Sequence, residues 1–189
     1  MRYPSAILAF VILSTFPASG QSWKKLPETF AANAQVKTMA GAAAAALNIT
    51  VERYSRDEDR NALLKEFSSG GAVALTAALR KAPAVGYLEV NGKKFPIQFA
   101  RQQESDKGRR ILVVVAEPIY FVGGGDVNAK PRDGFDLAVV QFAVDTLGLG
   151  EGTIAAAARV KAGNGPDGLE LQDYAAEPIK LVTVRRLYK

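Results

Sequence analysis

The sequence predicts an α+β fold: a mostly antiparallel sheet of about six to eight strands, with a helical pair inserted after the first strand. Two observations lead to this prediction. From residue 85 onward, apolar residues recur with a period of two between short turn sequences, so successive strands are joined by hairpins and pair antiparallel. The clear helix signals all lie between residues 55 and 83. The pattern leaves open whether the sheet is curved around the helices or closed into a barrel-like form.

The first strand is expected in the second half of the segment 42–55. There Leu47, Ile49 and Val51 alternate with polar residues, and a period of two with β-branched side chains is typical of a strand. The segment before it, residues 21–41, mixes polar and small residues with a proline. We expect that segment to be a flexible lead-in.

The helical pair follows directly. Ser55 and Glu58, three residues apart, match a capping box, and acidic residues near the start of a helix interact favourably with its dipole. The run Ser68–Gly71 (SSGG) ends the first helix, and Pro83 ends the second.

The rest of the chain is predicted to be strands. Asn91-Gly92 lies between two alternating runs and indicates a hairpin, because both central residues of a type I′ turn need positive φ. The run 109–117 (RRILVVVAE) is apolar on both faces, which is typical of a strand inside a sheet. Four further strands are expected at residues 135–145, 152–162, 168–174 and 178–188.

The N-terminus has the features of a cleavable secretory signal. Arg2 precedes the apolar run Ala6–Phe16, and the small residues Ala18–Gly20 follow it, so we expect cleavage between Gly20 and Gln21. The apolar run is too short to span a bilayer, which needs about 20 residues. We therefore expect an exported protein, periplasmic or extracellular, with no integral membrane segment and a single α+β domain over residues 42–189.

The composition excludes several kinds of chemistry. The sequence contains no Cys and no His, which removes thiolate nucleophiles, Ser-His pairs and the usual ligands of zinc. We expect no cofactor and no metal site. The formal charge of +5 is spread over scattered basic residues, of which Arg109-Arg110 and Arg185-Arg186 form short pairs. We interpret these pairs as solvated charges at strand ends, and we expect no nucleic acid as a partner.

Two features are candidates for ligand binding. The loop 121–134 contains three consecutive glycines that could bring backbone amides close to an anion. Side-chain oxygens follow the glycines and could face a ligand. The alternative is that this segment is only a connection between strands. Arg53 could be directed at an acidic ligand, or it could belong to an ion-pair network at the strand–helix junction. The candidate ligand-binding residues are Arg53, Gly124, Asp126, Asn128 and Asp133.

Several short motifs carry a resemblance to other proteins. They are Glu52–Ser55 (ERYS) with Asp59-Arg60, Gly108–Ile111 (GRRI), Gly150–Thr153 (GEGT) with Ala157, and Leu169-Glu170 with Glu177–Ile179, Leu181 and Val184. In these motifs the chain is similar to an uncharacterised group of exported proteins of unknown function from soil bacteria. The resemblance extends over most of the chain after the signal. It implies export and a shared fold, and it assigns no functional residues.

These observations favour a non-enzymatic, exported domain that binds a small ligand or another component of the cell envelope. One alternative is a hydrolase that acts on an extracellular polymer through two carboxylates. Its candidates are Glu117, Asp126, Asp133, Asp136 and Glu151. Another alternative is a structural protein without a small ligand. A binding domain predicts an apolar pocket or groove, whereas the hydrolase predicts a polar cleft with paired carboxylates. The sequence does not fix the oligomeric state.

Overall fold

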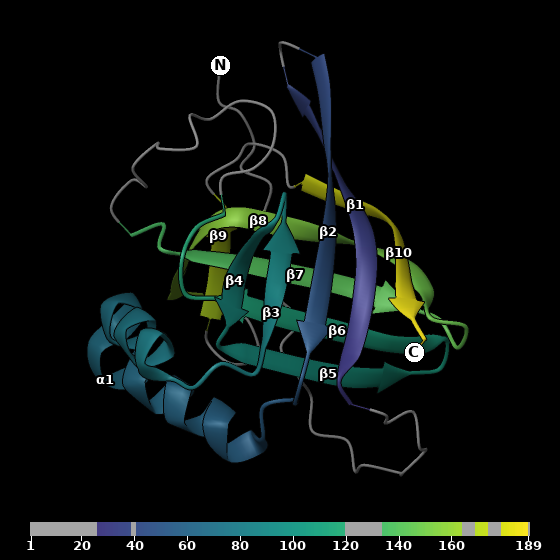
Figure 1. Cartoon of the computed structure of the whole chain (residues 1–189). Helices are drawn as coiled ribbons and strands as arrows, with labels where there is room; N and C mark the ends of the chain where they lie inside the picture. Colours follow the sequence, from purple (N-terminus) through teal and green to yellow (C-terminus); the bar gives the residue numbers. More distant parts are fainter. Residues whose placement is uncertain (1–25, 39–40, 120–133, 164–168, 174–178, 189) are drawn as a thin grey trace.

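The computed structural model describes residues 26–38, 41–119, 134–163, 169–173 and 179–188. These ranges form ten strands and one kinked helix (Figure 1). The strands are β1 (Glu28–Thr38), β2 (Gly41–Val51), β3 (Gly86–Val90), β4 (Lys93–Ile97), β5 (Phe99–Ser105), β6 (Gly108–Val115), β7 (Leu137–Val144), β8 (Leu149–Ala162), β9 (Leu169–Asp173) and β10 (Ile179–Leu187); the helix is α1 (Asp57–Lys81).

All strands belong to one antiparallel sheet, which confirms the predicted sheet type. Its order is β4-β3-β2-β1-β10-β8-β7-β6-β5, and β9 pairs with β8. The two ends of this order are neighbours in the chain, because only Gln98 separates β4 from β5. The backbone N–H of Gln98 donates to the carbonyl of Val114 (3.0 Å). The sheet therefore curves back on itself into a nearly closed, barrel-like form, with β1–β4 crossing over β5–β8 (Figure 1).

The structure corrects the predicted number of strands and the place of the helix. The sheet has ten strands instead of six to eight, and α1 follows the second strand instead of the first. Residues 28–38, assigned to the lead-in, form β1, which lies between β2 and β10. The inward positions of β1 include Ala32 and Ala34, and such small side chains give little of the apolar alternation that identifies a strand.

The helix largely follows its prediction but begins differently. The two predicted segments meet at Gly71, whose backbone is not helical (φ 65°, ψ −155°). The residue before the first helical turn is Arg56, and its N–H donates to the Asp59 carboxylate (2.9 Å). Ser55 does not cap the helix; its hydroxyl accepts from the N–H of Ala100 (3.1 Å) and ties the start of α1 to β5.

The hairpin and the internal strand were predicted correctly. Asn91 and Gly92 connect β3 and β4 with φ values of 51° and 78°, the positive values that a type I′ turn requires. Strand β6, from the run 109–117, is paired on both sides, with β5 and with β7.

The apolar residues form two cores, one inside the curved sheet and one outside it. Inside, side chains from nearly every strand pack together, and the rings of Phe30 and Phe142 meet edge-on with centroids 5.0 Å apart. Outside, α1 covers part of β5–β9 through Leu75 and Leu79. On β6, Ile111 belongs to the inner core and Val114 to the outer core. This second core explains why the strand is apolar on both faces.

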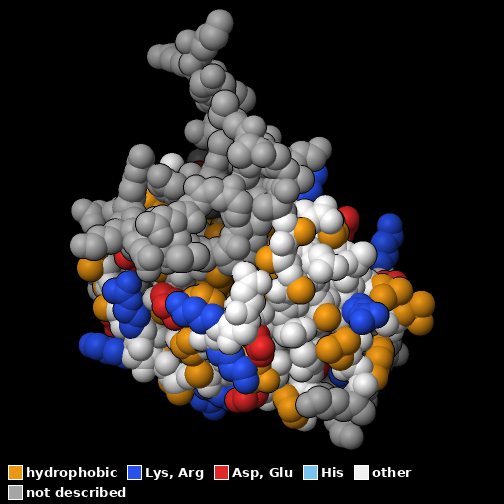
Figure 2. Space-filling view, turned by 45° about the horizontal axis from the view of Figure 1, so that its top comes forward, with side chains coloured by type: hydrophobic (Ala, Val, Ile, Leu, Met, Phe, Trp, Pro, Cys, Tyr) orange, Lys and Arg blue, Asp and Glu red, His pale blue; other side chains and the backbone are white. Residues whose placement is uncertain are grey.

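In the part of the chain that the structure describes, no helix has the length and apolar character needed to cross a membrane. On the face that Figure 2 shows, basic and acidic side chains are interspersed with apolar ones, and the described residues form no stripe of one charge.

Candidate ligand-binding site

Among the sequence-predicted ligand-binding residues, only Arg53 lies in the described part of the chain. Its side chain is 44% exposed, and its Nη1 lies 3.8 Å from a carboxylate oxygen of Asp59. Arg53 therefore takes part in the surface ion pairs at the start of α1. Gly124, Asp126, Asn128 and Asp133 lie outside the described residues.

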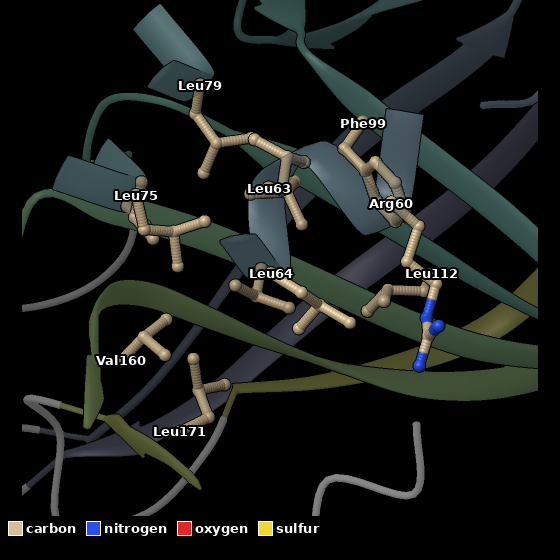
Figure 3. Close-up of a pocket in the computed structure, with 12 residues that line it drawn as sticks. Arg60, Leu63, Leu64, Leu75, Leu79, Phe99, Leu112, Val160 and Leu171 are labelled. Atoms are coloured by element: carbon tan, nitrogen blue, oxygen red, sulfur yellow. The ribbon is translucent and has the colours of Figure 1, made fainter. Parts of the chain in front are cut away.

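A different site lies between α1 and the outer face of the sheet. It is a pocket of about 80 Å³, shown in Figure 3, and every side chain that lines it is apolar except that of Arg60. Helix α1 contributes two leucines from each side of its kink, and each strand from β5 to β9 contributes at least one side chain. The lining residues are Arg60, Leu63, Leu64, Leu75, Leu79, Phe99, Leu112, Val114, Leu137, Val139, Val160 and Leu171.

The register of the strands explains why this part of the outer face is apolar. Residues paired across antiparallel strands share a face, and the same face recurs two residues along each strand. The first row, here called the apolar row, consists of Phe99, Val114, Val139 and Ala155 on β5 to β8. The next row, here called the mixed row, consists of Arg101, Leu112, Gln141 and Thr153 on the same strands. The outer face thus changes from apolar to polar between these two rows, which lie two residues, or about 7 Å, apart along each strand.

Two arginines mark the polar end of the pocket. Arg60 extends from the first half of α1 past Phe99 toward Leu112, and its guanidinium points away from Val160 and Leu171 (Figure 3). Burial, and then the positive charge of Arg101, lower the pKa of Arg60, while Asp57 partly opposes this. Arg101 contacts Asp57 at 2.7 Å.

The two halves of α1 pack differently against the sheet. In the second half, Leu75 and Leu79 are almost fully buried. In the first half, Leu63, Leu64 and Phe67 are only half-buried. The pocket therefore lies between a tightly packed and a less tightly packed half of the helix. The non-helical Gly71 separates the two halves, and its φ of 65° suits glycine far better than any residue with a Cβ.

A second cluster of polar residues is buried at the start of β1. Glu28 is 3% exposed, and three side chains donate to its carboxylate. The Tyr54 hydroxyl lies 2.6 Å from Oε1, Arg109 contacts both oxygens at 2.8 and 2.6 Å, and Arg186 Nε lies 3.0 Å from Oε2. Arg109 also donates to Gln102 (2.7 Å).

The burial and the charges of this cluster change the pKa values of Tyr54 and Arg109. Burial, and then the negative charge and hydrogen bond of Glu28, raise the pKa of Tyr54 well above its ordinary range. Burial acts to lower the pKa of Arg109, but the hydrogen bonds that Arg109 donates to Glu28 and the nearby charges raise it overall. A cavity of about 150 Å³ adjoins the cluster, and Arg109, Arg186 and acidic residues are among those that line it.

This cluster corrects the interpretation of the two arginine pairs. Arg109 and Arg186 are not solvated; their side chains are 9% and 11% exposed. Their partners Arg110 and Arg185 lie one residue away and therefore on the other face of their strands. The alternation of a strand could have indicated that one arginine of each pair points inward, but nothing local identifies Glu28 as the partner, 81 residues from Arg109.

The carboxylates proposed for hydrolysis do not converge in the described ranges. Asp136 lies 3.5 Å from Arg80, and Glu117 and Glu151 are exposed. Asp126 and Asp133 fall outside those ranges. Within them, no three acidic residues lie together in a way that could hold a metal ion.

Comparison with known proteins yields no match: no family model matches the chain, and neither does any curated protein or solved structure. The basis for a functional proposal is therefore the geometry of the two sites described above.

Proposed function

We propose that this protein is a binding domain that holds a small apolar molecule, or the apolar part of an amphiphile, between α1 and the sheet. The observation that supports this is a pocket lined by apolar side chains from six different elements, with a single cation at one end. Most ligand sites in proteins have this character, an apolar concave surface with few polar groups that set orientation.

An energetic argument favours a ligand over an empty gap. The pocket is partly open to solvent, and apolar surface in contact with water is less favourable than apolar surface in contact with an apolar group. A ligand that enters the pocket covers its walls and also transfers its own apolar surface out of water, at roughly 0.8 kcal/mol per methylene.

The size of the pocket sets the size of the ligand. A cavity of about 150 Å³ accommodates benzene, so about 80 Å³ accommodates a chain of only a few carbons. A longer chain requires the first half of α1 to move away from the sheet. The half-buried leucines of that half and the non-helical backbone at Gly71 favour such a movement.

The proposal is tested by filling the pocket. Val160 lies on β8 opposite Leu171 of β9 and lines the pocket, so Val160→Phe should occupy part of it. We expect octan-1-ol, titrated by calorimetry or NMR, to bind the wild-type protein and to bind Val160→Phe at least about tenfold more weakly, since two lost methylenes already cost that much.

The matched control is Val73→Phe. Val73 is on α1 but 82% exposed, so the same chemical change there should leave affinity unchanged. The proposal is wrong if octan-1-ol and shorter alcohols fail to bind the wild-type protein, or if both variants bind them equally well.

We also propose that the domain is exported. The support is the pattern of Arg2, the apolar run Ala6–Phe16 and the small residues Ala18–Gly20, all outside the described residues. Expression of the full chain in a bacterium should give a periplasmic or secreted product whose first residue, measured by mass spectrometry, is Gln21. A product that retains the apolar run contradicts this proposal.

A further inference from the structure

The cavity beside the Glu28 cluster lies at one end of the barrel-like sheet. The turn between β5 and β6, the turn between β7 and β8 and the end of β10 all contribute to its walls. Its volume is about 150 Å³, and side chains of both charges face it. Arg109 and Arg186 line it together with Glu104, Asp106 and Asp145. None of these residues lines the apolar pocket, so the cavity is a separate site.

Arg109 has hydrogen-bond donors that its own partners do not use. Nη1 donates to Glu28 (2.8 Å) and to Gln102 (2.7 Å), and Nη2 donates to Glu28 (2.6 Å). A guanidinium has five N–H donors, so the N–H of Nε and the second N–H of Nη2 remain. No described residue accepts a hydrogen bond from either. Because Arg109 lines the cavity, these two donors are available to a molecule bound there.

The remaining donors of Arg109 fit one kind of ligand group. They lie side by side in the plane of the guanidinium and form a fork that matches the two oxygens of a carboxylate. The guanidinium is also held in place, since Glu28 and Gln102 fix its other edges and its Cζ lies 5.5 Å from the centre of the Phe30 ring. More than nine-tenths of Arg109 is buried, so the fork has little freedom to turn away.

The acidic residues of the cavity fit a group of the opposite charge. Glu104 is paired with Arg109 across β5 and β6, so the two side chains lie on the same face of the sheet. Asp106 follows in the turn, and Asp145 accepts hydrogen bonds from the backbone of the β7–β8 turn. Glu104 and Asp106 are exposed, and neither forms an ion pair with a described residue. These carboxylates repel a purely anionic ligand and attract a cationic group.

We infer that this cavity binds a small zwitterion that carries a carboxylate and an ammonium group, such as an amino acid. The carboxylate accepts from Nε and Nη2 of Arg109, and the ammonium group faces Glu104 and Asp106. The size agrees, because a cavity of about 150 Å³ accommodates benzene, a molecule of about six non-hydrogen atoms, and the smaller amino acids are of that size. This site goes beyond the proposed function and does not depend on it.

The test compares probes of one size that differ in charge. L-Alanine, isobutyrate and isopropylammonium are titrated into the wild-type protein at pH 7 and followed by NMR. We expect alanine to bind at least about tenfold more tightly than either of the others, since each of them lacks one of the two charge-assisted contacts. Added salt should weaken alanine binding. Val160→Phe, which alters the apolar pocket, should leave alanine binding unchanged.

A double variant tests the acidic side of the site. Glu104→Gln with Asp106→Asn should weaken alanine binding at least about tenfold and leave isobutyrate binding as tight as before or tighter. Both residues are exposed, so the variant should stay folded, and a circular dichroism melting curve checks this. The matched control is Glu66→Gln with Glu117→Gln, which removes two exposed carboxylates outside the cavity and should change neither affinity.

Arg109→Lys tests the other side of the site. It keeps the positive charge and removes the fork, so alanine and isobutyrate should both bind more weakly. Because Arg109 also contacts the buried Glu28, a melting curve accompanies this variant, and the double variant decides the question if Arg109→Lys does not fold.

Three results would overturn the inference. Failure of alanine to bind the wild-type protein rules out the site. Equal binding of alanine and isobutyrate, unchanged in the double variant, means that the acidic residues take no part. Binding of isopropylammonium as tight as that of alanine means that the Arg109 fork takes no part. None of these results bears on octan-1-ol, so the apolar pocket and this cavity stand or fall separately.

Discussion

Glu28 connects parts of the chain that are far apart in sequence. Its carboxylate accepts hydrogen bonds from Tyr54, from Arg109 on β6 and from Arg186 on β10. A buried ion pair is not by itself a strong source of stability, because the charges lose their hydration. Removal of the carboxylate is nevertheless costly when the remaining charges stay buried, and here two guanidinium groups contact the same carboxylate.

Glu28→Gln should therefore destabilise the protein by about 3–5 kcal/mol, since it removes the carboxylate that two nearly buried arginines share. Urea denaturation measures this change. Glu104→Gln is the control: Glu104 is exposed and lies opposite Arg109 in the β5–β6 pairing, and its substitution should change stability by less than about 0.5 kcal/mol. Equal effects of the two substitutions would contradict the role given to Glu28.

Tyr54 makes the stability of the fold depend on pH in the alkaline range. Its pKa is near 10 in an unfolded chain and is raised in the folded protein by burial and by Glu28. Above pH 10 the unfolded chain therefore releases this proton first. The contribution is fully present below pH 10 and is lost as the pH rises above it.

Tyr54→Phe should lower stability at pH 7 by about 1–3 kcal/mol, because Glu28 loses a hydrogen bond. The decrease in stability between pH 10 and 11.5 should become shallower, by up to about 1.4 kcal/mol per pH unit. Chemical denaturation of both proteins across this range tests the prediction. Parallel curves for wild type and Tyr54→Phe would show that the Tyr54 proton does not contribute.

Single residues could be predicted from the sequence where their role is local. The Asn91-Gly92 turn is fixed by backbone conformation alone, and it was predicted correctly. Arg109 and Arg186 were misinterpreted, because their burial depends on a carboxylate from another strand. The candidate residues of the 121–134 loop remain predictions, since the structure does not describe them.

At the scale of elements, strong apolar alternation was a reliable guide and alanine-rich segments were not. The alanine run of β2 permits a helix, yet it is extended because it pairs along its whole length with β1. The pocket could not be predicted, because its residues come from one helix and five strands. One sequence feature indicated that the outer face of the sheet is covered. The run 109–117 is apolar on both faces, so a second element had to pack against the outer face of this strand.

The kink in α1 leads to a prediction for that element. Gly71→Ala should destabilise the protein by about 1–3 kcal/mol, because a residue with a Cβ is strained at φ 65°. Steric contact is not the cause, since a Cβ at this position would meet no atom within 4 Å. Ser69→Ala, on the exposed part of the same helix, serves as the control in thermal denaturation. A stable Gly71→Ala protein would show that the helix can straighten at little cost.

At the scale of the whole molecule, the sheet depends on a pairing between its first and last described strands. Strand β1 lies between β2 and β10, and β10 joins it to β8. Ile179, Leu181 and Val184 of β10 also belong to the inner core. Removal of β10 therefore exposes two strand edges in the middle of the sheet together with apolar surface.

A chain ending at residue 178 should show no cooperative unfolding transition. A peptide of residues 179–189, added to the truncated chain, should restore the transition, because it supplies both the missing hydrogen bonds and the missing core residues. Calorimetry and near-ultraviolet circular dichroism measure both effects. A cooperative transition in the truncated chain alone would mean that β10 is dispensable.

The pairing of Thr29 with Leu187 also determines when the molecule can become complete. During synthesis β1 leaves the ribosome well before its second neighbour, β10, which is the last of the described strands along the chain. Contacts between residues so distant in sequence form slowly, since closing a long loop costs entropy before any bond repays it. A nascent chain of this topology therefore holds β1 without its second neighbour until β10 has emerged from the ribosome.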